Sequence, residues 1–313
     1  ANTLYHGVLF FPDYPAIICR RSRVVFHADI DSSGGKTYTS RGMSDFLSDE
    51  NFEKFRNLIY RESGIHFSST NRTILESRLR ERLRAAKLGD VSEYYGLITR
   101  SGEELKVLLD AVTTNLTRFF RNAAHFDTLE KYVVPDLLRH KAGKGEKELR
   151  LWSAGCSTGE EPFSLAMSLR ENLPGDYTIR IIASDISLKS LMIGKEGFYP
   201  EPRIGGVPDS YLSRYFDKKS GGYQVREEIR NLVRFDYHNL KNDSGLRGLD
   251  IVFCRNVLIY FDEPAQKAVV EKFWDSMNGH SYLFIGHSES LFGMKTRFEF
   301  VKTDWACIYR KFA

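Results

Sequence analysis

The chain has 313 residues, a formal net charge of +4, 42% hydrophobic and 27% charged residues, which is typical of a folded protein with two domains or one domain and an appendage. The mild charge does not by itself indicate a nucleic-acid partner. No apolar run approaches the roughly 20 residues that span a bilayer, so we expect no membrane insertion. The four cysteines form no CxxC pair, which argues against a zinc or redox motif and predicts free thiols in a reducing cytoplasm.

The first half of the chain is predicted to be helical. Residues 1–42 form an extension of unknown role that ends in the polar stretch DSSGGKTYTSRG. From 43 to 140 apolar residues recur at helical spacing, and Ser101 with Glu104 forms a capping box. One apolar stripe consists of Phe52, Phe55, Leu58 and Ile59 and ends at Gly64. The polar segment 141–147 is interpreted as a linker to a second domain, 148–313.

The second half alternates between strands and helices. Strands are expected at 148–154, 177–185, 249–257 and 281–287, and helices at 160–173, from about 188, and at 263–277. This order favours an α/β fold with a doubly wound, mostly parallel sheet, closed by an antiparallel hairpin at 298–312. Residues 193–235 break the rhythm with six glycines and predict a small β insertion, with GGYQVREEI and NLVRFDY as its strands.

The first strand-to-helix corner, LWSAGCSTGEEP at 151–162, is unusually rich in small residues. It does not match GxGxxG, so the dinucleotide fingerprint is absent. Small residues let a backbone approach a ligand closely, and a helix N-terminus favours anions. Glu160 and Glu161 instead suit a cationic group such as an ammonium, or they only stabilise the first helical turn; this corner alone leaves both open.

Polar residues also follow the later strands, and parallel sheets bind ligands at those ends. Asp185 is suited to ribose hydroxyls or, alternatively, to capping the next helix. Asn239, Arg255 and Asn256 interrupt or follow apolar runs, where polar groups must find partners. These strand ends outline an adenosine-sized site without a phosphate cradle, which fits S-adenosylmethionine (SAM).

Five sequence blocks resemble the chemotaxis receptor methyltransferases of the CheR family. They are TTNLTRFFR (113–121), SAGCSTGEEP (153–162), ASDIS (183–187), FCRNVLIYFD (253–262) and GHSES (286–290), within a match over about 45–312. The resemblance implies a helical N-terminal domain and an α/β methyltransferase domain with an inserted antiparallel β subdomain. It implies methyl transfer from SAM to receptor glutamates, which gives methyl esters and S-adenosylhomocysteine (SAH).

The resemblance also assigns site residues. It implies that cofactor contacts come from Asn115, Thr117, Arg121, Asp185, Asn239, Leu240, Arg255 and Asn256. One of Glu160 and Glu161 would hold the methionine end; we favour Glu161, but the sequence does not separate them. Arg121 and Tyr260 would position the substrate carboxylate, and no metal is implied. Glycine and cysteine stand at 155 and 156, where many relatives have alanines; all are small, so the pocket should survive.

The proposed chemistry needs no general base, because a glutamate with an ordinary pKa of about 4.3 is ionised at neutral pH. A dry aromatic mouth with one or two orienting donors would suffice. We predict that Phe119, Phe120, Tyr260 and Phe261 form it, although the 119–120 pair equally suits a core position. His287 is a candidate for supporting the pocket, whereas the remaining isolated histidines are interpreted as surface or packing residues: His66, His125 and His140.

Partners are predicted from charge and from the resemblance. The basic helix face between Arg72 and Lys87 is either a solvated surface or a docking face for acidic receptor helices, and the family favours docking. The β insertion is a candidate site for a receptor's C-terminal peptide. We expect a cytoplasmic monomer recruited to membrane receptor arrays. A non-catalytic SAM-binding adaptor is the alternative; a nucleic-acid methyltransferase is disfavoured because CRNVLIY replaces the usual base-holding motif.

Overall fold

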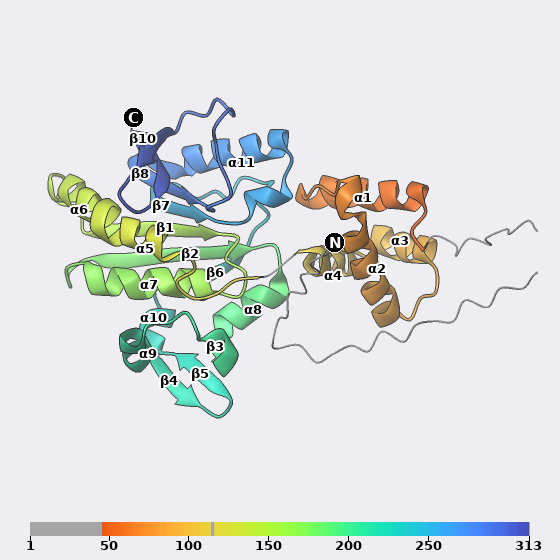
Figure 1. Cartoon of the computed structure of the whole chain (residues 1–313), viewed down its shortest axis with the longest axis horizontal. Coiled ribbons are helices and arrows are strands. Elements are labelled where there is room, and N and C mark those ends of the chain that lie inside the picture. The colour runs from red at the N-terminus through yellow and green to blue at the C-terminus, as the bar shows by residue number, and fades with distance from the viewer. Residues whose placement is uncertain (1–45, 114–115, 313) are drawn as a thin grey trace, which may run out of the picture. The chain divides into compact units, whose positions relative to one another are not determined.

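The computed structural model describes residues 46–113 and 116–312 (Figure 1). The predicted extension at 1–42 lies outside the described residues, as does Asn115. In the described ranges, no helix combines the length and the apolar character needed to cross a membrane.

The chain from 46 to 113 is helical, as expected. Its elements are α1 (Asp49–Ser63), the short turn η1 (Ser69–Asn71), α2 (Arg72–Ala86), α3 (Val91–Arg100) and α4 (Gly102–Val112). The predicted apolar stripe of α1 is buried in a core that also takes Leu75, Leu79 and Leu83 of α2. Gly64 ends α1 in the left-handed region at φ 78°, which a residue without a Cβ adopts at little cost.

Only half of the predicted capping box forms at α4. Ser101 Oγ accepts a hydrogen bond from the Glu104 N–H at 3.2 Å. The Glu104 carboxylate does not complete the box but accepts bonds from Arg82 at 2.7 Å and from the Tyr94 hydroxyl at 2.8 Å. Burial and this carboxylate raise the pKa of the Tyr94 hydroxyl well above its usual range. Contacts with Arg82 and Tyr94 therefore replace the bond that Glu104 would make to the Ser101 N–H in a complete capping box.

Removing this N-cap gives a first prediction. We expect Ser101→Ala to lower the free energy of unfolding by about 1 kcal/mol, because one N–H at the start of α4 loses its partner. Urea denaturation measures the change. Ser77→Ala, at an exposed position inside α2, is the control and should leave stability unchanged or slightly raised. Equal stabilities of the two variants would contradict the role of Ser101.

A helical run precedes the large sheet. It consists of α5 (Ala123–Thr128), a π-helical turn η2 (Leu129–Val133) and α6 (Val134–Ala142). The apolar residues of this run are buried in one core, among them Phe126, Leu129, Val133 and Leu137.

The remainder of the chain, from β1 onward, is built around a seven-stranded sheet with the strand order β6-β2-β1-β7-β8-β10-β9. The strands are β1 (Glu148–Ala154), β2 (Thr178–Asp185), β6 (Val233–Tyr237), β7 (Leu249–Cys254), β8 (Met277–Ile285), β9 (Glu299–Lys302) and β10 (Cys307–Phe312). The first five in spatial order pair in parallel, and β10 pairs antiparallel with β8 and β9. The mostly parallel sheet and the closing hairpin are confirmed.

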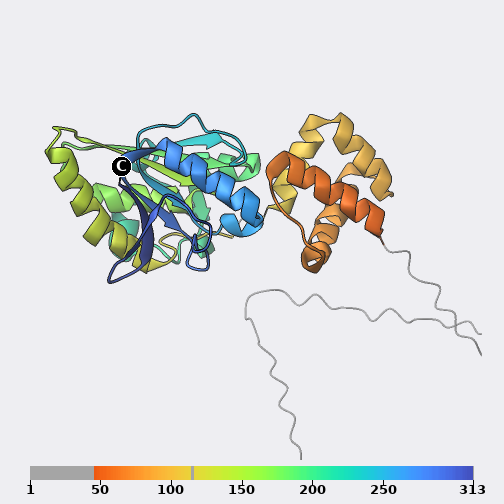
Figure 2. The same cartoon turned by 90° about the horizontal axis from the view of Figure 1, so that it is seen from above.

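The sheet has an apolar core on each face. Alternate residues of β1 divide between them: Leu151 faces the core shared with α7 (Glu160–Asn172), and Trp152 faces the core shared with α11 (Glu263–Ser276). The two helices therefore cover opposite faces (Figure 1), and α11 runs across its face in the view from above (Figure 2). Alternation along each strand follows from the two-residue period of β structure.

The insertion is smaller than predicted. After α8 (Leu188–Glu196), a separate antiparallel sheet has the order β3-β5-β4. Its strands are β3 (Phe198–Pro200), β4 (Phe216–Lys219) and β5 (Gly222–Val225), accompanied by η3 (Glu201–Arg203), α9 (Asp209–Tyr215) and α10 (Glu227–Arg230). The second predicted strand, NLVRFDY, instead forms β6 at the edge of the large sheet, because it pairs with β2 in parallel. We call residues 198–230 the inserted subdomain.

Candidate functional site

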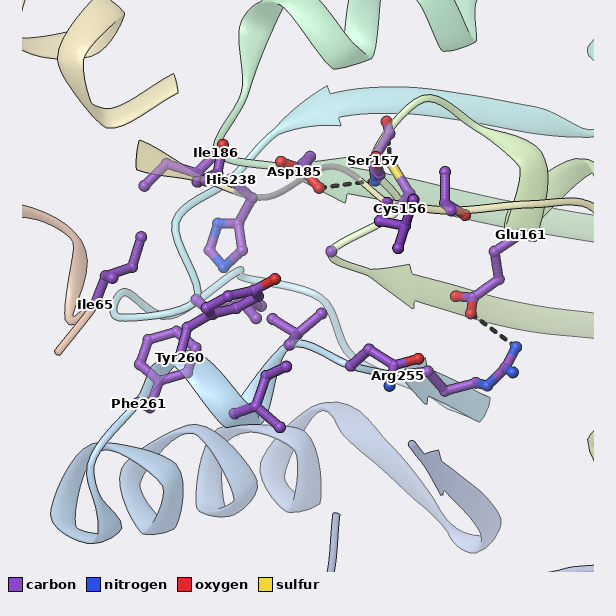
Figure 3. A pocket seen from close by; sticks show the side chains of 18 of the residues that line it. Ile65, Cys156, Ser157, Glu161, Asp185, Ile186, His238, Arg255, Tyr260 and Phe261 are labelled. Carbon is purple, nitrogen blue, oxygen red and sulfur yellow. Dashed lines mark hydrogen bonds and ion pairs between the residues drawn. The ribbon is translucent and has the colours of Figure 1, made fainter. Parts of the chain in front are cut away.

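A cavity of about 260 Å³ opens where four parallel strands end (Figure 3). Among the residues that line the cavity, Gly155, Cys156 and Ser157 come directly after β1, and Asp185 is the last residue of β2. Other lining residues come directly after β6 and β7. Ser63, the last residue of α1, and Ile65, two residues after it, also line the cavity. The position agrees with the rule that open α/β sheets bind ligands at the carboxyl ends of their strands.

The β1–α7 loop, residues 155–159, begins with a glycine in the left-handed region of the backbone, packed closely against a neighbouring side chain. Gly155 has a φ of 83°, and a Cβ built there would lie 2.4 Å from Cγ2 of Val257. The N–H groups of Gly155 and Cys156 both donate to the carbonyl of Ser184, at 2.8 and 2.9 Å. Glycine therefore fits position 155 of this chain better than the alanine of many relatives, which would need a shift of Val257 or of the loop backbone, so the two residues are not interchangeable here as the sequence suggested.

Of the two neighbouring glutamates, Glu161 lines the cavity and Glu160 does not. Glu161 lines the cavity, where it accepts hydrogen bonds from Ser153 Oγ at 2.8 Å and from Arg255 Nη1 at 3.2 Å. Glu160 is fully buried but does not line the cavity; it bonds Thr158 Oγ1 at 2.7 Å and pairs with Arg203 at 2.5 Å. Burial raises the pKa of both carboxyls. The cofactor contact predicted for one of the two stays a prediction, and Glu161 is the one placed on the cavity wall.

Asp185 is held in place at the end of β2. Its two oxygens accept hydrogen bonds from the backbone N–H groups of Ser157 at 2.8 Å and Ser187 at 2.9 Å. Burial raises its pKa despite these bonds. Each oxygen keeps a second lone pair, so the carboxylate can still accept bonds from a ligand.

Asn239 and Leu240 line the cavity after β6, as predicted. The Asn239 amide also has a structural task, because it donates to the carbonyl of Glu62 at 2.7 Å and accepts from the Lys241 N–H at 3.0 Å. These bonds connect the cavity wall to the end of α1. His238 lines the cavity as well and was missed in the sequence, where an isolated histidine carries no specific signal.

Arg255 and Asn256 follow β7 and both line the cavity. The Arg255 side chain is 2% exposed and binds Glu161 and, through its Nη2, the carbonyl of Arg121. Asn256 adopts the left-handed region at φ 58°, and its N–H donates to Glu289 Oε2 at 2.9 Å.

Glu289 is a positioning residue that sequence reasoning did not identify, although its GHSES block was recognised. Its carboxylate accepts bonds from the N–H groups of Gly286, Asn256 and Ile259. It therefore ties the end of β8 to the segment that carries Tyr260. The signal would have been the glycine at 286, where a Cβ would lie 2.5 Å from the carboxylate.

Only part of the predicted aromatic mouth forms. Tyr260 and Phe261 line the cavity, and the Tyr260 hydroxyl points into it (Figure 3). Phe119 is instead buried against Tyr199 and Phe216, and Phe120 packs on Phe126 and Tyr211, so neither of the pair lines the cavity. The pair takes core positions, because Phe119 belongs to the hydrophobic core and Phe120 packs against it.

His287 is exposed and does not line the cavity, which speaks against its candidate role. His125 is buried beneath Phe284, and burial lowers its pKa to about 4, so it remains a neutral packing residue at physiological pH. Thr117 and Arg121 line the cavity, so the cofactor contacts predicted for them stay predictions, and Arg121 Nη1 donates to the Leu116 carbonyl at 2.9 Å. Arg118 also lines it and was not predicted.

Several cavity residues keep buried polar atoms without a hydrogen-bond partner among the described residues. These atoms are Ser157 Oγ, His238 Nε2, Arg255 Nε and Asn256 Oδ1. Buried polar groups are normally paired, so the cluster indicates a cavity that a polar ligand completes. Within the described ranges, no group of three or more histidine, cysteine or carboxylate side chains is placed to hold a metal ion.

Comparison with known proteins shows the family of this chain. Residues 115–307 match the family model "CheR methyltransferase, SAM binding domain", and residues 50–113 match "CheR methyltransferase, all-alpha domain". The chain is 36% identical to chemotaxis protein methyltransferase 2 of Vibrio cholerae (78% of this chain, 87% of that protein). It is 38% identical to chemotaxis protein methyltransferase 2 of Pseudomonas aeruginosa (77% and 86%) and 36% identical to the chemotaxis protein methyltransferase of Escherichia coli (80% and 88%).

Proposed function

The chain belongs to the CheR methyltransferase family of SAM-dependent enzymes, and from this premise we propose that it methylates glutamate side chains of chemotaxis receptors. The products would be glutamate methyl esters and SAH. The observation that supports this best is the cavity at the strand ends, which presents two carboxylates, Glu161 and Asp185, and no glycine-rich phosphate cradle. Such a cavity suits a ligand with an ammonium and ribose hydroxyls.

The residues present fit SAM. We assign Glu161 to the ammonium of its methionine end and Asp185 to the ribose, since a carboxylate binds both kinds of donor well. Thr117, Leu240, Arg255 and Asn256 would complete the cofactor site, and the unpartnered Ser157 Oγ and Asn256 Oδ1 offer further polar contacts. When bound, SAM supplies an electrophilic methyl group that a carboxylate oxygen can accept.

The chain's own contribution to the reaction is orientation and the exclusion of water. A substrate glutamate is already ionised at pH 7, so no residue has to remove a proton. Arg121 and Tyr260 both line the cavity and carry donors suited to a carboxylate, and we assign them to positioning the substrate. Phe261 adds apolar surface beside Tyr260 (Figure 3). Orientation of this kind lowers barriers by about 7–11 kcal/mol in favourable cases.

The function is tested by methyl transfer to receptors. We expect the protein, incubated with methyl-labelled SAM and receptor-enriched membranes, to produce label that mild alkali releases as methanol. Arg121→Ala should lower kcat/KM by about 100-fold, because an orienting cation is lost. SAH binding without any transfer would instead favour the non-catalytic adaptor. Label that resists alkali would exclude ester formation.

We propose that acidic receptor helices dock on the basic face of α2. Arg80, Arg84 and Lys87 are exposed there. Arg82 does not belong to the accessible face, because its side chain is 19% exposed and pairs with Glu104. Glu76 partly neutralises Arg80 at 2.6 Å, so docking would exchange an internal ion pair for an intermolecular one. This partner would place the protein in the cytoplasm beside membrane receptors.

The inserted subdomain offers a second surface for a receptor. Its strand β4 lies at one edge of the small sheet and exposes Lys218 and Lys219. An extended peptide can add to such an edge, and the two lysines would attract a terminal carboxylate.

A further inference from the structure

The β1–α7 loop holds three residues with positive φ among five. Gly155, Ser157 and Gly159 have φ values of 83°, 49° and 95°. A serine at positive φ is strained, and such a backbone conformation persists only where surrounding contacts hold it in place. Contacts on both sides of the loop therefore decide whether its cavity-lining atoms are in place.

Contacts on the cavity side come from β2. The carbonyl of Ser184 accepts from the N–H groups of Gly155 and Cys156, and Asp185 accepts from the N–H of Ser157. These bonds hold the first three loop residues, but they do not reach Thr158 or the start of α7.

Contacts on the other side come from the inserted subdomain. The Tyr199 hydroxyl, from β3, donates to the Thr158 carbonyl at 2.7 Å. Arg203, from η3, donates to Thr158 Oγ1 at 2.7 Å, and the same nitrogen lies 2.5 Å from Glu160 Oε1. A Cβ at Gly159 would lie 2.9 Å from the Tyr199 oxygen, so the two segments are in direct contact.

Glu160 makes this connection costly to break. Its side chain is 0% exposed, and Arg203 is its ion-pair partner among the described residues. Burial already raises the pKa of the Glu160 carboxyl. Without Arg203 the carboxylate would have to take up a proton or rotate away, and Thr158, which donates to it, would move with it.

We propose that the inserted subdomain holds the β1–α7 loop in its cofactor-binding shape, with Arg203 as the positioning residue. Arg203 does not line the cavity and acts through Thr158 and Glu160. The inference goes beyond partner recognition by the subdomain and rests on the SAM binding stated above. It predicts that a change in the insertion alters cofactor affinity while the substrate-orienting residues stay intact.

Calorimetry with SAH tests this on the full chain. We expect Arg203→Met to raise the Kd for SAH roughly 10- to 100-fold, because small displacements of a positioning group have effects of this size. In the methyl-transfer assay KM for SAM should rise in step while kcat at saturating SAM stays near the wild-type value. A loss of kcat with an unchanged KM would overturn the proposal.

Arg214→Met is the matched control. Arg214 lies in α9 of the same subdomain and pairs with Glu171 at 2.6 Å, near the distal end of α7. It therefore links the same two segments away from the cavity, and its loss should leave the Kd for SAH within twofold of wild type. If both arginine variants weaken SAH binding equally, the insertion acts through general stability and the proposal fails.

Two further measurements keep the test decisive. Thr158→Val removes the hydroxyl that joins Arg203 to Glu160 with little change in volume but leaves the Arg203–Glu160 ion pair, so it should raise the Kd for SAH in the same direction even if Arg203→Met folds poorly. Hydrogen exchange without SAH should show faster exchange at residues 155–160 in Arg203→Met than in Arg214→Met; equal exchange would contradict the proposal. If the wild-type chain itself binds no SAH, the proposed function fails, whereas the exchange result still decides the positioning role.

Discussion

Replacement of Arg255 by methionine is expected to abolish measurable SAH binding and to lower the free energy of unfolding by about 3–5 kcal/mol. Arg255 is buried, and its guanidinium joins the Glu161 carboxylate to the carbonyl of Arg121. Methionine keeps much of the volume but leaves Glu161 without its cation. Calorimetry with SAH and urea denaturation measure the two losses.

A control and a partial rescue sharpen this result. Arg247→Met removes an exposed arginine that pairs with Asp243 at 2.9 Å, and should change stability by less than about 1 kcal/mol and SAH binding not at all. The double variant Arg255→Met with Glu161→Leu should regain stability, since no unpaired charge remains, but not SAH binding. Tight SAH binding by the double variant would contradict the role assigned to Glu161.

Gly155→Ala is expected to destabilise the protein by about 1–3 kcal/mol and to weaken SAH binding at least tenfold. The new methyl group would lie 2.4 Å from Val257, at a backbone φ of 83° that disfavours side chains. Both Gly155 and Val257 line the cavity, so whichever side yields changes its shape.

A double-mutant cycle separates the clash from the backbone strain. Val257→Ala removes the atoms that the new methyl group meets, so Gly155→Ala should cost less in that background; about 1 kcal/mol of backbone strain should remain. Gly175→Ala is the control, because a Cβ there meets nothing within 4 Å. Additive effects of the Gly155 and Val257 substitutions would exclude the clash as the cause.

The cavity residues differ in how readily the sequence reveals them. Asp185, Arg255 and Asn256 were predicted because polar side chains at the ends of apolar strands are conspicuous. Glu289 and His238 were missed because their contacts are with residues distant along the chain: Glu289 binds N–H groups of Asn256 and Ile259, and His238 packs on Trp152. Gly286 is the one local hint for Glu289, and nothing near His238 in the sequence indicates Trp152.

When two neighbouring residues are of the same type, the sequence pattern does not show which of them faces the cavity. Glu160 and Glu161 are equivalent in the sequence, yet helical geometry turns them about 100° apart. One therefore faces the cavity and the other faces Arg203. In the same way, Tyr260 and Phe261 reached the cavity, whereas Phe119 and Phe120 were absorbed by the core.

The sequence alone determined the order of strands and helices, the family and the edge of the sheet at which the cavity opens, because local periodicity and strand-end polarity are written in consecutive residues. Only the tertiary structure decided which strand belongs to which sheet. It moved Val233–Tyr237 from the expected insertion into the large sheet. It also decided which glutamate meets the cavity and that Arg203 stands behind the β1–α7 loop. These outcomes depend on contacts between residues far apart in the chain, and no local pattern encodes them.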